Sequence, residues 1–332
     1  MKIDKKMAGA VIAAALIAAF GSFLVTSSHY QKKEDRAFGE IKSIRENNSR
    51  YHYINPLLAY DLPESQDLGE YSELHKKLTD LVEDEKSSGK ADDISVYFRG
   101  NQGRWLGVNE NERYYPASLL KVVVMMAYYD QAQSDPSILG RAIIYSPQIQ
   151  SQVVDSEFNT PSSLKLNISY KVDDLIRYMI VDSDNGATYT LLDSLNDNKL
   201  DQIYSDFGLQ GPNDNSAYEI STRNYSLFFR ILYNATYLNR EFSEKALSLL
   251  SQTKFKDGLL AGLPSGTAVA HKFGEHVLND DKGNQIGVEL HDCGLVYGRQ
   301  NYLLCVMTRG KNVDELKNVI KDISALVYNE NN

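Results

Sequence analysis

A serine and a lysine stand at the head of a long uncharged run in the sequence Tyr115-Pro116-Ala117-Ser118-Leu119-Leu120-Lys121-Val122-Val123-Val124-Met125-Met126-Ala127-Tyr128-Tyr129. A proline just ahead of such a run predicts the start of a buried helix. Ser118 and Lys121 are spaced i and i+3, so they share one face of its first turn. A hydroxyl and an amine at the positive end of a helix form a candidate nucleophile and base, and the dipole favours a developing oxyanion.

The Ser-x-x-Lys pattern is not specific by itself. It also occurs at Ser87/Lys90, Ser162/Lys165 and Ser251/Lys254, where we interpret it as a solvated helix face. Only the Ser118 copy puts a lysine on a strongly apolar segment, where burial would lower its pKa and leave a neutral base. Because serine is also a common helix cap, catalysis needs further support.

Composition limits the class of protein. The chain has 332 residues, enough for one sizeable domain or two small ones, and 42% of its residues are hydrophobic. A net charge of −9, with no basic face in the sequence, argues against a nucleic-acid partner. The two cysteines exclude a disulfide-rich scaffold and a cysteine-based zinc site. No metal or cofactor is implied.

The N-terminus carries a membrane or export signal. Residues 7–25 hold no charge and follow Lys2, Lys5 and Lys6, which suits a spanning helix or a signal peptide. The length of the run, and the lack of a small-residue cleavage pattern, favour a retained anchor over residues 1–27. We expect a single-pass protein of the cell membrane with its main domain outside the cytoplasm, or a secreted protein if the segment is cleaved.

A polar stretch at 28–70 is interpreted as a juxtamembrane stalk. Within it, the segment Tyr51-His52-Tyr53-Ile54-Asn55-Pro56-Leu57-Leu58 is too apolar for a free linker. It either docks on the domain or forms a short juxtamembrane patch.

Residues 71–332 are expected to form the globular domain. Helical periodicity over 71–90 is followed by two strand-like runs around a glycine-containing turn, which predict a hairpin. A helical block spans about 116–262, and three further strands precede an amphipathic C-terminal helix. The pattern predicts an α/β fold of the α+β type, with a five-stranded antiparallel sheet and an inserted helical subdomain. The predicted strands cover residues 94–99, 104–108, 268–276, 287–297 and 302–308, and the last helix covers 313–328.

Two further motifs join Ser118. Ser183-Asp184-Asn185 follows an apolar helix face on a connection inside the helical block, and Lys272-Phe273-Gly274 lies in the first of the three late strands. At these residues the sequence resembles the penicillin-recognising serine hydrolases, that is, class A β-lactamases and D,D-peptidases, whose motifs are S-x-x-K, S-D-N and K-T-G in this order. The resemblance covers roughly residues 71–330 and implies a β-lactamase/transpeptidase-like fold.

The resemblance implies a catalytic role for four residues. Ser118 would attack the amide carbonyl of a β-lactam or a D-Ala-D-Ala-like cell-wall peptide and form an acyl-enzyme. Lys121 would take the proton of Ser118, and Ser183 would relay a proton to the leaving nitrogen. Lys272 would supply positive charge for a substrate carboxylate and help to keep Lys121 neutral.

Substrate-binding roles follow from the same resemblance. Asn185 would hold the acyl side chain of the substrate, and Gly274 would let the strand backbone approach the ligand. The backbone N–H groups of Ser118 and Glu275 would form the oxyanion hole. Phe273 departs from the family motif, because the hydroxyl expected to bind a substrate carboxylate beside Lys272 is missing there.

A second departure concerns deacylation. Class A β-lactamases carry an E-x-x-L-N element between the second and third motifs, and its glutamate activates water. Residues 208–219 hold no such element, and Glu219, the only nearby glutamate, is expected to cap the following helix. We therefore expect acylation to be retained and hydrolysis of the acyl-enzyme to be slow.

Structural interpretations of the same residues remain open. Ser183 and Asn185 could form only a turn, and Lys272 could be a solvated strand lysine. Glu275, His276 and His291 suggest a Ser-His-Asp site, but no G-x-S-x-G surrounds Ser118.

Cys293 and Cys305 lie on consecutive strands, and the length of the loop decides whether they face each other. We expect free buried thiols.

Three functions are therefore considered. The first is a serine acyl-enzyme hydrolase with slow deacylation. The others are a competent β-lactamase that uses another base, and a catalytically silent membrane-anchored protein that binds cell-wall material. The joint presence of Ser118, Lys121, Ser183, Asn185 and Lys272 favours an enzyme over the silent protein.

Overall fold

The computed structural model describes residues 45, 51–57, 71–100, 103–153, 162–196, 198–212 and 218–331. Its centre is an antiparallel sheet of five strands in the order β2-β1-β9-β8-β7, which confirms the predicted sheet. The strands are β1 (Asp93–Gly100), β2 (Trp105–Val108), β7 (Ala268–Asn279), β8 (Gln285–Tyr297) and β9 (Tyr302–Gly310). β7 forms one edge of this sheet, and the third motif lies on it.

Alternating side chains give the sheet two buried faces. On β1, Phe98 packs into one hydrophobic cluster and its neighbour Tyr97 into another. On β9, Val306 packs into the same cluster as Phe98, and Cys305 packs into the same cluster as Tyr97. Because side chains alternate between faces along a strand, a sheet with both faces apolar needs a covering layer on each side.

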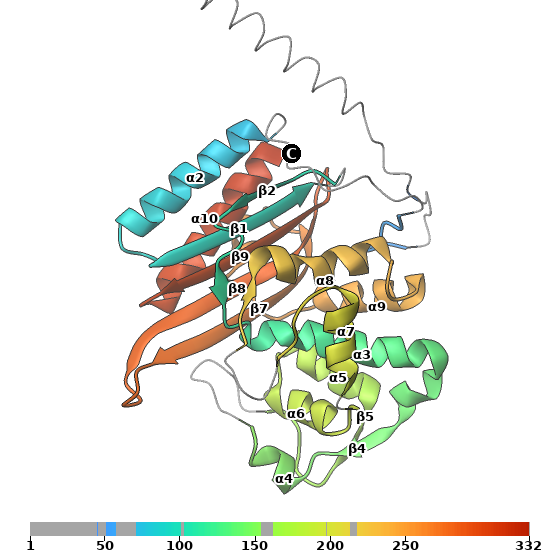
Figure 1. Cartoon of the computed structure of the whole chain (residues 1–332). Coiled ribbons are helices and arrows are strands. Elements are labelled where there is room, and N and C mark those ends of the chain that lie inside the picture. Colours follow the sequence, from blue (N-terminus) through green and yellow to red (C-terminus); the bar gives the residue numbers. More distant parts are fainter. Residues whose placement is uncertain are drawn as a thin grey trace, which may run out of the picture. The chain divides into compact units, whose positions relative to one another are not determined.

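The two terminal helices cover one face. α2 (Ser72–Ser87) and α10 (Val313–Asn331) lie side by side over the sheet, as Figure 1 shows. Both are amphipathic: Leu78 and Val82 of α2, and Ile320 and Ile323 of α10, are buried against the sheet side chains. This layer agrees with the helices predicted at the two ends of the domain.

A helical block covers the other face. Its central helix α3 (Lys121–Ser134) has an unbroken buried run from its first residue to Tyr129. A helix that is apolar all round belongs in a core, so the single charge at its start, Lys121, is carried into the interior with it. The other helices of the block are α4 (Pro147–Gln150), α5 (Val172–Val181), α6 (Asn185–Asp193), α7 (Asn198–Asp206), α8 (Thr222–Asn234) and α9 (Arg240–Leu250), with 3-10 turns η1 (Ala117–Leu120), η2 (Pro136–Gly140) and η3 (Leu259–Gly262).

Two small sheets inside the block were not predicted. One pairs β3 (Arg113–Tyr114) with β6 (Ile220–Ser221), and the other pairs β4 (Ala142–Ile144) with β5 (Ser169–Lys171). With two or three residues per strand, they are too short to show a period of two in the sequence. The β3–β6 pair links the segment before Ser118 to the start of α8.

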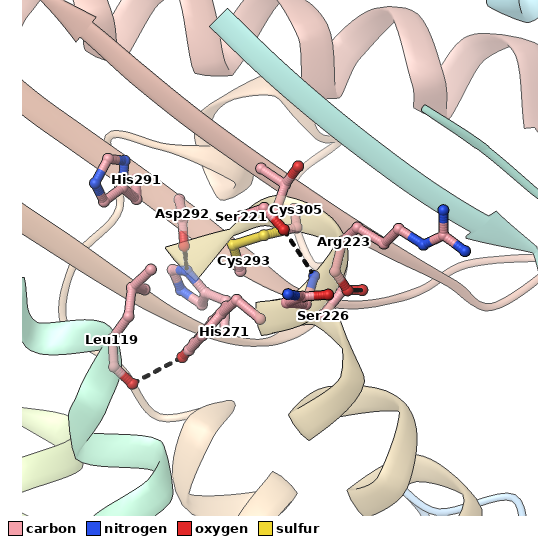
Figure 2. The surroundings of a disulfide bond; sticks show 12 residues. Leu119, Ser221, Arg223, Ser226, His271, His291, Asp292, Cys293 and Cys305 are labelled. Atoms are coloured by element: carbon pink, nitrogen blue, oxygen red, sulfur yellow. Dashed lines mark hydrogen bonds and ion pairs between the residues drawn. A yellow bond between two sulfur atoms is a disulfide. The ribbon is translucent and has the colours of Figure 1, made fainter. Parts of the chain in front are cut away.

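The cysteines correct our expectation of free thiols. Cys293 of β8 faces Cys305 of β9 in the register of the two strands, and the two form a disulfide. Figure 2 shows this bond beside a buried pair, His271 and Asp292, whose Nδ1 and Oδ1 atoms are 2.8 Å apart. Asp292 also accepts a hydrogen bond of 2.9 Å from the N–H of Leu259, so this carboxylate ties β7, β8 and η3 together.

Residues 51–57, predicted either to dock on the domain or to form a juxtamembrane patch, are docked. The carboxylate of Glu244 on α9 accepts hydrogen bonds of 2.7 to 3.1 Å from the N–H groups of His52, Tyr53 and Ile54. Ile54 is 7% exposed and belongs to the core of the helical block. The predicted anchor at 7–25 lies outside the described residues, and none of the helices that the structure does describe could cross a membrane.

Candidate active site

Ser118 lies in a tight turn that leads into α3. The turn Ala117–Leu120 is a 3-10 helix, and the α-helix begins at Lys121, one turn later than Pro116 predicts. Ala117 has a φ of 48°, a left-handed conformation that is costly for a residue with a side chain. The hydroxyl of Tyr225 on α8 donates a 2.9 Å hydrogen bond to the Leu119 carbonyl, which fastens the turn to α8.

The chain just before this turn is fastened to β8. The N–H of Tyr115 donates to Glu289 at 3.1 Å, and the Tyr115 carbonyl accepts a 3.0 Å bond from Nε2 of His291. Burial lowers the pKa of His291 to about 4, so its imidazole is neutral near pH 7. In the sequence His291 suggests only a member of a Ser-His-Asp site, whereas in the structure it positions the segment that carries Ser118.

Ser183 is the centre of the site. Its hydroxyl oxygen lies 3.2 Å from Oγ of Ser118, 3.1 Å from Nζ of Lys121 and 3.0 Å from Nζ of Lys272. Ser183 has a φ of 55°, which turns the chain sharply between α5 and α6. Three segments far apart in the sequence thus meet at one oxygen atom.

Lys121 is buried and has three acceptors for its amine. Nζ contacts the Ser183 carbonyl at 2.6 Å, the Ser183 hydroxyl at 3.1 Å and Oδ1 of Asn185 at 2.7 Å. With the side chain only 4% exposed, burial lowers the pKa of Lys121 to about 7, against an opposing effect of the Asp184 charge. Near pH 7 a large fraction of this amine is therefore neutral and able to accept a proton.

Asp184 shapes the loop rather than the chemistry. Its carboxylate caps α6 by accepting a 2.9 Å bond from the N–H of Ala187, and it accepts bonds from the hydroxyls of Ser162 at 2.8 Å and Ser163 at 3.1 Å. The interpretation of the Ser162/Lys165 pattern as a solvated helix face is therefore wrong for Ser162. A Cβ added at Gly186 would lie 2.4 Å from the Ser162 hydroxyl, so a glycine is needed there.

Lys272 is more deeply buried than Lys121. It is 0% exposed, and its Nζ donates to Ser183 Oγ and to the Phe273 carbonyl, both at 3.0 Å. The pKa of Lys272 lies well below its ordinary value, first because of burial and second because of the Lys121 charge. The alternative of a solvated strand lysine is excluded by this geometry.

Gly274 and Glu275 follow on β7. A Cβ at Gly274 would lie 2.6 Å from the Pro116 carbonyl and 3.2 Å from the Leu119 nitrogen, so this glycine lets β7 pack directly on the turn that carries Ser118. We had expected it to admit a ligand, and in the described structure its closest neighbour is the turn itself. The side chain of Glu275 is half-buried, and burial raises the pKa of its carboxyl to about 7.

Two further residues that the sequence suggested have other surroundings. His276 packs against Tyr115, with the rings tilted by 35° and their centroids 4.2 Å apart. Glu219 is exposed and does not cap the next helix, because Ser221 accepts the N–H of Asn224 at the start of α8. The Ser221 hydroxyl therefore caps α8, which is the role that the sequence suggested for Glu219.

The arrangement suits acyl transfer by a serine. The Ser118 hydroxyl is joined to two amines of lowered pKa through one further hydroxyl, so its proton has a short route to a neutral base. Within the described part of the chain, no group of three or more His, Cys, Asp or Glu side chains is arranged to hold a metal ion. The geometry therefore brings together Ser118, Lys121, Ser183, Asn185 and Lys272, as their motifs predict.

Comparison with known proteins adds two findings. The model of the beta-lactamase enzyme family matches residues 73–331. No curated protein matches the chain.

Among solved structures, a point mutant of PBP-A in an acyl-enzyme complex with penicillin G is 23% identical, with a TM-score of 0.67 over 81% of this chain and 98% of that one. The TLA-3 extended-spectrum β-lactamase is 19% identical, with a TM-score of 0.66 over 77% and 98% of the two chains. A β-lactamase from Chitinophaga pinensis is 18% identical, with a TM-score of 0.66 over 77% and 100%. At these identities the likeness establishes a shared fold.

Proposed function

Since the chain belongs to the beta-lactamase enzyme family and is a serine hydrolase of the β-lactamase or penicillin-binding type, we propose that Ser118 forms an acyl-enzyme with a β-lactam or a D-Ala-D-Ala-like cell-wall peptide. The observation that carries this proposal is the contact of one oxygen, Ser183 Oγ, with Ser118, Lys121 and Lys272. A serine held in this way is an activated nucleophile.

The steps follow from the contacts. Oγ of Ser118 bonds to the substrate carbonyl carbon while its proton passes by way of the Ser183 hydroxyl to neutral Lys121. The Ser183 hydroxyl, which donates to Ser118 in the free protein, rotates to accept this proton and to donate its own to Lys121. The carbon–nitrogen bond then breaks, and the leaving nitrogen takes a proton from Ser183, which is replenished by Lys121. The products are an acyl-Ser118 ester and an amine. Lys272 donates to the Ser183 hydroxyl and holds it in place throughout.

Slow deacylation is the second part of the proposal. Hydrolysis of the ester needs a base that activates water on Ser118, and Glu219, the only glutamate in residues 208–219, has an exposed side chain. Asp184, whose charge acts on Lys121, has its carboxylate engaged by Ser162, Ser163 and the N–H of Ala187. The oxygens of this carboxylate are therefore already engaged in holding the loop between α5 and α6.

Intact-mass spectrometry of the full-length protein mixed with penicillin G tests both parts. We expect an adduct with the mass of the antibiotic that appears with time and persists for hours, and none in the Ser118→Ala variant. An adduct that disappears while the antibiotic is consumed would mean fast deacylation and a competent β-lactamase. Absence of any adduct, together with no labelling of Ser118 by a fluorophosphonate, would contradict the acyl-enzyme and favour a cell-wall-binding protein.

We also propose that residues 7–25 anchor the protein in the cell membrane, with the catalytic domain outside the cytoplasm. Support comes from the uncharged run after Lys2, Lys5 and Lys6, and from the Cys293–Cys305 disulfide, a bond typical of oxidising compartments. In cell fractionation with carbonate washing, the full chain should stay with membranes and a variant lacking residues 1–27 should not. Release of the full chain by carbonate would contradict the anchor.

A further inference from the structure

We propose that this site accepts substrates that carry an uncharged group, such as a carboxamide or an ester, at the position where a substrate carboxylate would meet Lys272 and the missing hydroxyl of the third motif. Phe273, stacked on Phe255, determines this specificity. The inference rests on the proposed function, because it concerns the leaving-group side of the substrate that acylates Ser118.

Lys272 has no exposed surface to offer an incoming carboxylate. Its side chain is 0% exposed, and its amine is held by the Ser183 hydroxyl and by the Phe273 carbonyl. The ring of Phe273 lies over the same amine, with Nζ 4.1 Å from the ring centroid. The Phe273 ring therefore covers this amine, which donates to Ser183 and is shielded from a ligand.

The Phe273 ring that covers Lys272 is paired with a second aromatic ring. The rings of Phe255 and Phe273 are nearly parallel, with interplanar angle 18° and centroids 4.2 Å apart, and both side chains are partly exposed. An ionised carboxylate placed against these rings would lose water and gain no hydrogen bond, which is costly. A neutral amide or ester loses much less, and its apolar part gains contact with the rings.

The neighbouring charges do not replace the lost carboxylate partner. Glu275, two residues further along β7 than Phe273, presents a half-buried carboxyl with one buried oxygen that has no hydrogen-bond partner among the described residues. If ionised, this group repels an anion. Lys254, next to Phe255, forms an ion pair with Asp182. Lys256, one residue beyond Phe255, donates to the Thr253 carbonyl at 2.7 Å. Lys317, whose charge acts on Glu275, pairs with Asp314 at 2.9 Å. Because these nearby cations are already engaged, the described surroundings favour an uncharged group over an anion.

A matched pair of β-lactams tests the inference on the full-length protein. Penicillin G carries a free carboxylate, and its methyl ester differs only in lacking that charge. We measure the second-order rate of Ser118 acylation by intact mass for each ligand. We expect the ester to react at least as fast as the free acid with the native protein.

Two variants separate the effect of a hydroxyl at position 273 from the effect of side-chain size. Phe273→Thr and Phe273→Val leave side chains of similar size, and only threonine has a hydroxyl that can bind the carboxylate. We expect the acid-to-ester rate ratio to rise about tenfold in the threonine variant, the worth of one hydrogen bond to a charged group. The ratio in the valine variant should stay within about twofold of the native ratio, since no hydrogen bond is restored.

Three results would overturn the inference. The first is a native protein acylated about tenfold faster by the free acid than by the ester, which would show a working carboxylate site. The second is an equal rise of the ratio in both variants, which would mean that ring size alone decides. The third is no reaction with either β-lactam while a fluorophosphonate labels Ser118. Failure of the fluorophosphonate as well would instead refute the acyl-enzyme of the proposed function.

Discussion

Single residues decide the chemistry of this site. Ser118, Lys121, Ser183 and Lys272 could be predicted from the sequence because each lies in a short motif whose order along the chain is informative. Glu289 and His291 could not be predicted, since they act on the backbone of Tyr115 from a strand more than 170 residues away. Nor could the hydrogen bond from Ser162 to Asp184, because Ser162 belongs to a motif copy that looked like surface.

The lowered pKa of Lys121 predicts a pH dependence of acylation. Only the neutral amine accepts a proton, and burial places its pKa at about 7 instead of 10.5. The rate of adduct formation with the penicillin methyl ester should therefore rise about tenfold per pH unit below this value and level off above it. Rates measured by intact mass from pH 5 to 9 check this prediction.

The control for this profile is Lys121→Arg, whose side chain stays charged at every accessible pH. Its acylation rate should be lower by at least about a hundredfold, without the inflection. The free energy of unfolding should also rise with pH in this range. Between pH 7 and 10.5 the Lys121 amine is mostly protonated in the unfolded chain and mostly neutral in the native protein, so the cost of burying it falls as pH rises. A native rate profile that is flat down to pH 5 would contradict Lys121 as the base.

At the scale of elements, the site depends on how closely β7 packs on the turn before α3. The sequence predicts that both elements exist, because residues 268–276 form a strand-like run and residues 122–129 are uniformly apolar. It does not predict their separation, since a glycine in a strand is compatible with a bulge, a ligand or a close neighbour. Only the structure shows that Gly274 faces the Pro116 carbonyl.

Gly274→Ala should therefore separate the strand from the nucleophile. The added methyl would lie 2.6 Å from a backbone oxygen, so either β7 or the Ala117–Leu120 turn must shift. We expect a loss of about 1–3 kcal/mol in the free energy of unfolding, and slower acylation of Ser118. Urea denaturation and the intact-mass assay measure the two effects.

Gly140→Ala is the matched control, because a Cβ there meets nothing within 4 Å. This variant should unfold and acylate like the native protein. Equal behaviour of the two variants would show that the contact between β7 and the turn carries no energy.

At the scale of the whole molecule, contacts between segments that are far apart in the sequence complete the domain. The layers follow from periodicity, so the order of helices and strands could be predicted. The disulfide could not, because a shift of register by one residue would have placed Cys293 and Cys305 on opposite faces. The docking of residues 51–57 was left open by the sequence, since its main partner is a single carboxylate on α9, Glu244.

Glu244→Gln tests how much the docking of residues 51–57 contributes to stability. The change removes the negative charge that three consecutive N–H groups share, and charge-assisted hydrogen bonds are the stronger ones. We expect a loss of about 1–3 kcal/mol in the free energy of unfolding and faster proteolysis between residues 51 and 57. The control is Glu241→Gln on the exposed side of the same helix, which should change neither quantity. Unchanged proteolysis in Glu244→Gln would show that the segment is held by its apolar side chains alone.

The aromatic ring over Lys272 has a consequence for inheritance. A phenylalanine codon becomes a serine codon by one base change, and serine at position 273 would bring back a hydroxyl beside the buried Lys272 amine. Antibiotics that carry a carboxylate would then meet a binding partner that the present ring withholds. A population grown under such a drug is therefore one mutational step away from a protein that captures it, and position 273 is the place to look for that step in sequenced survivors.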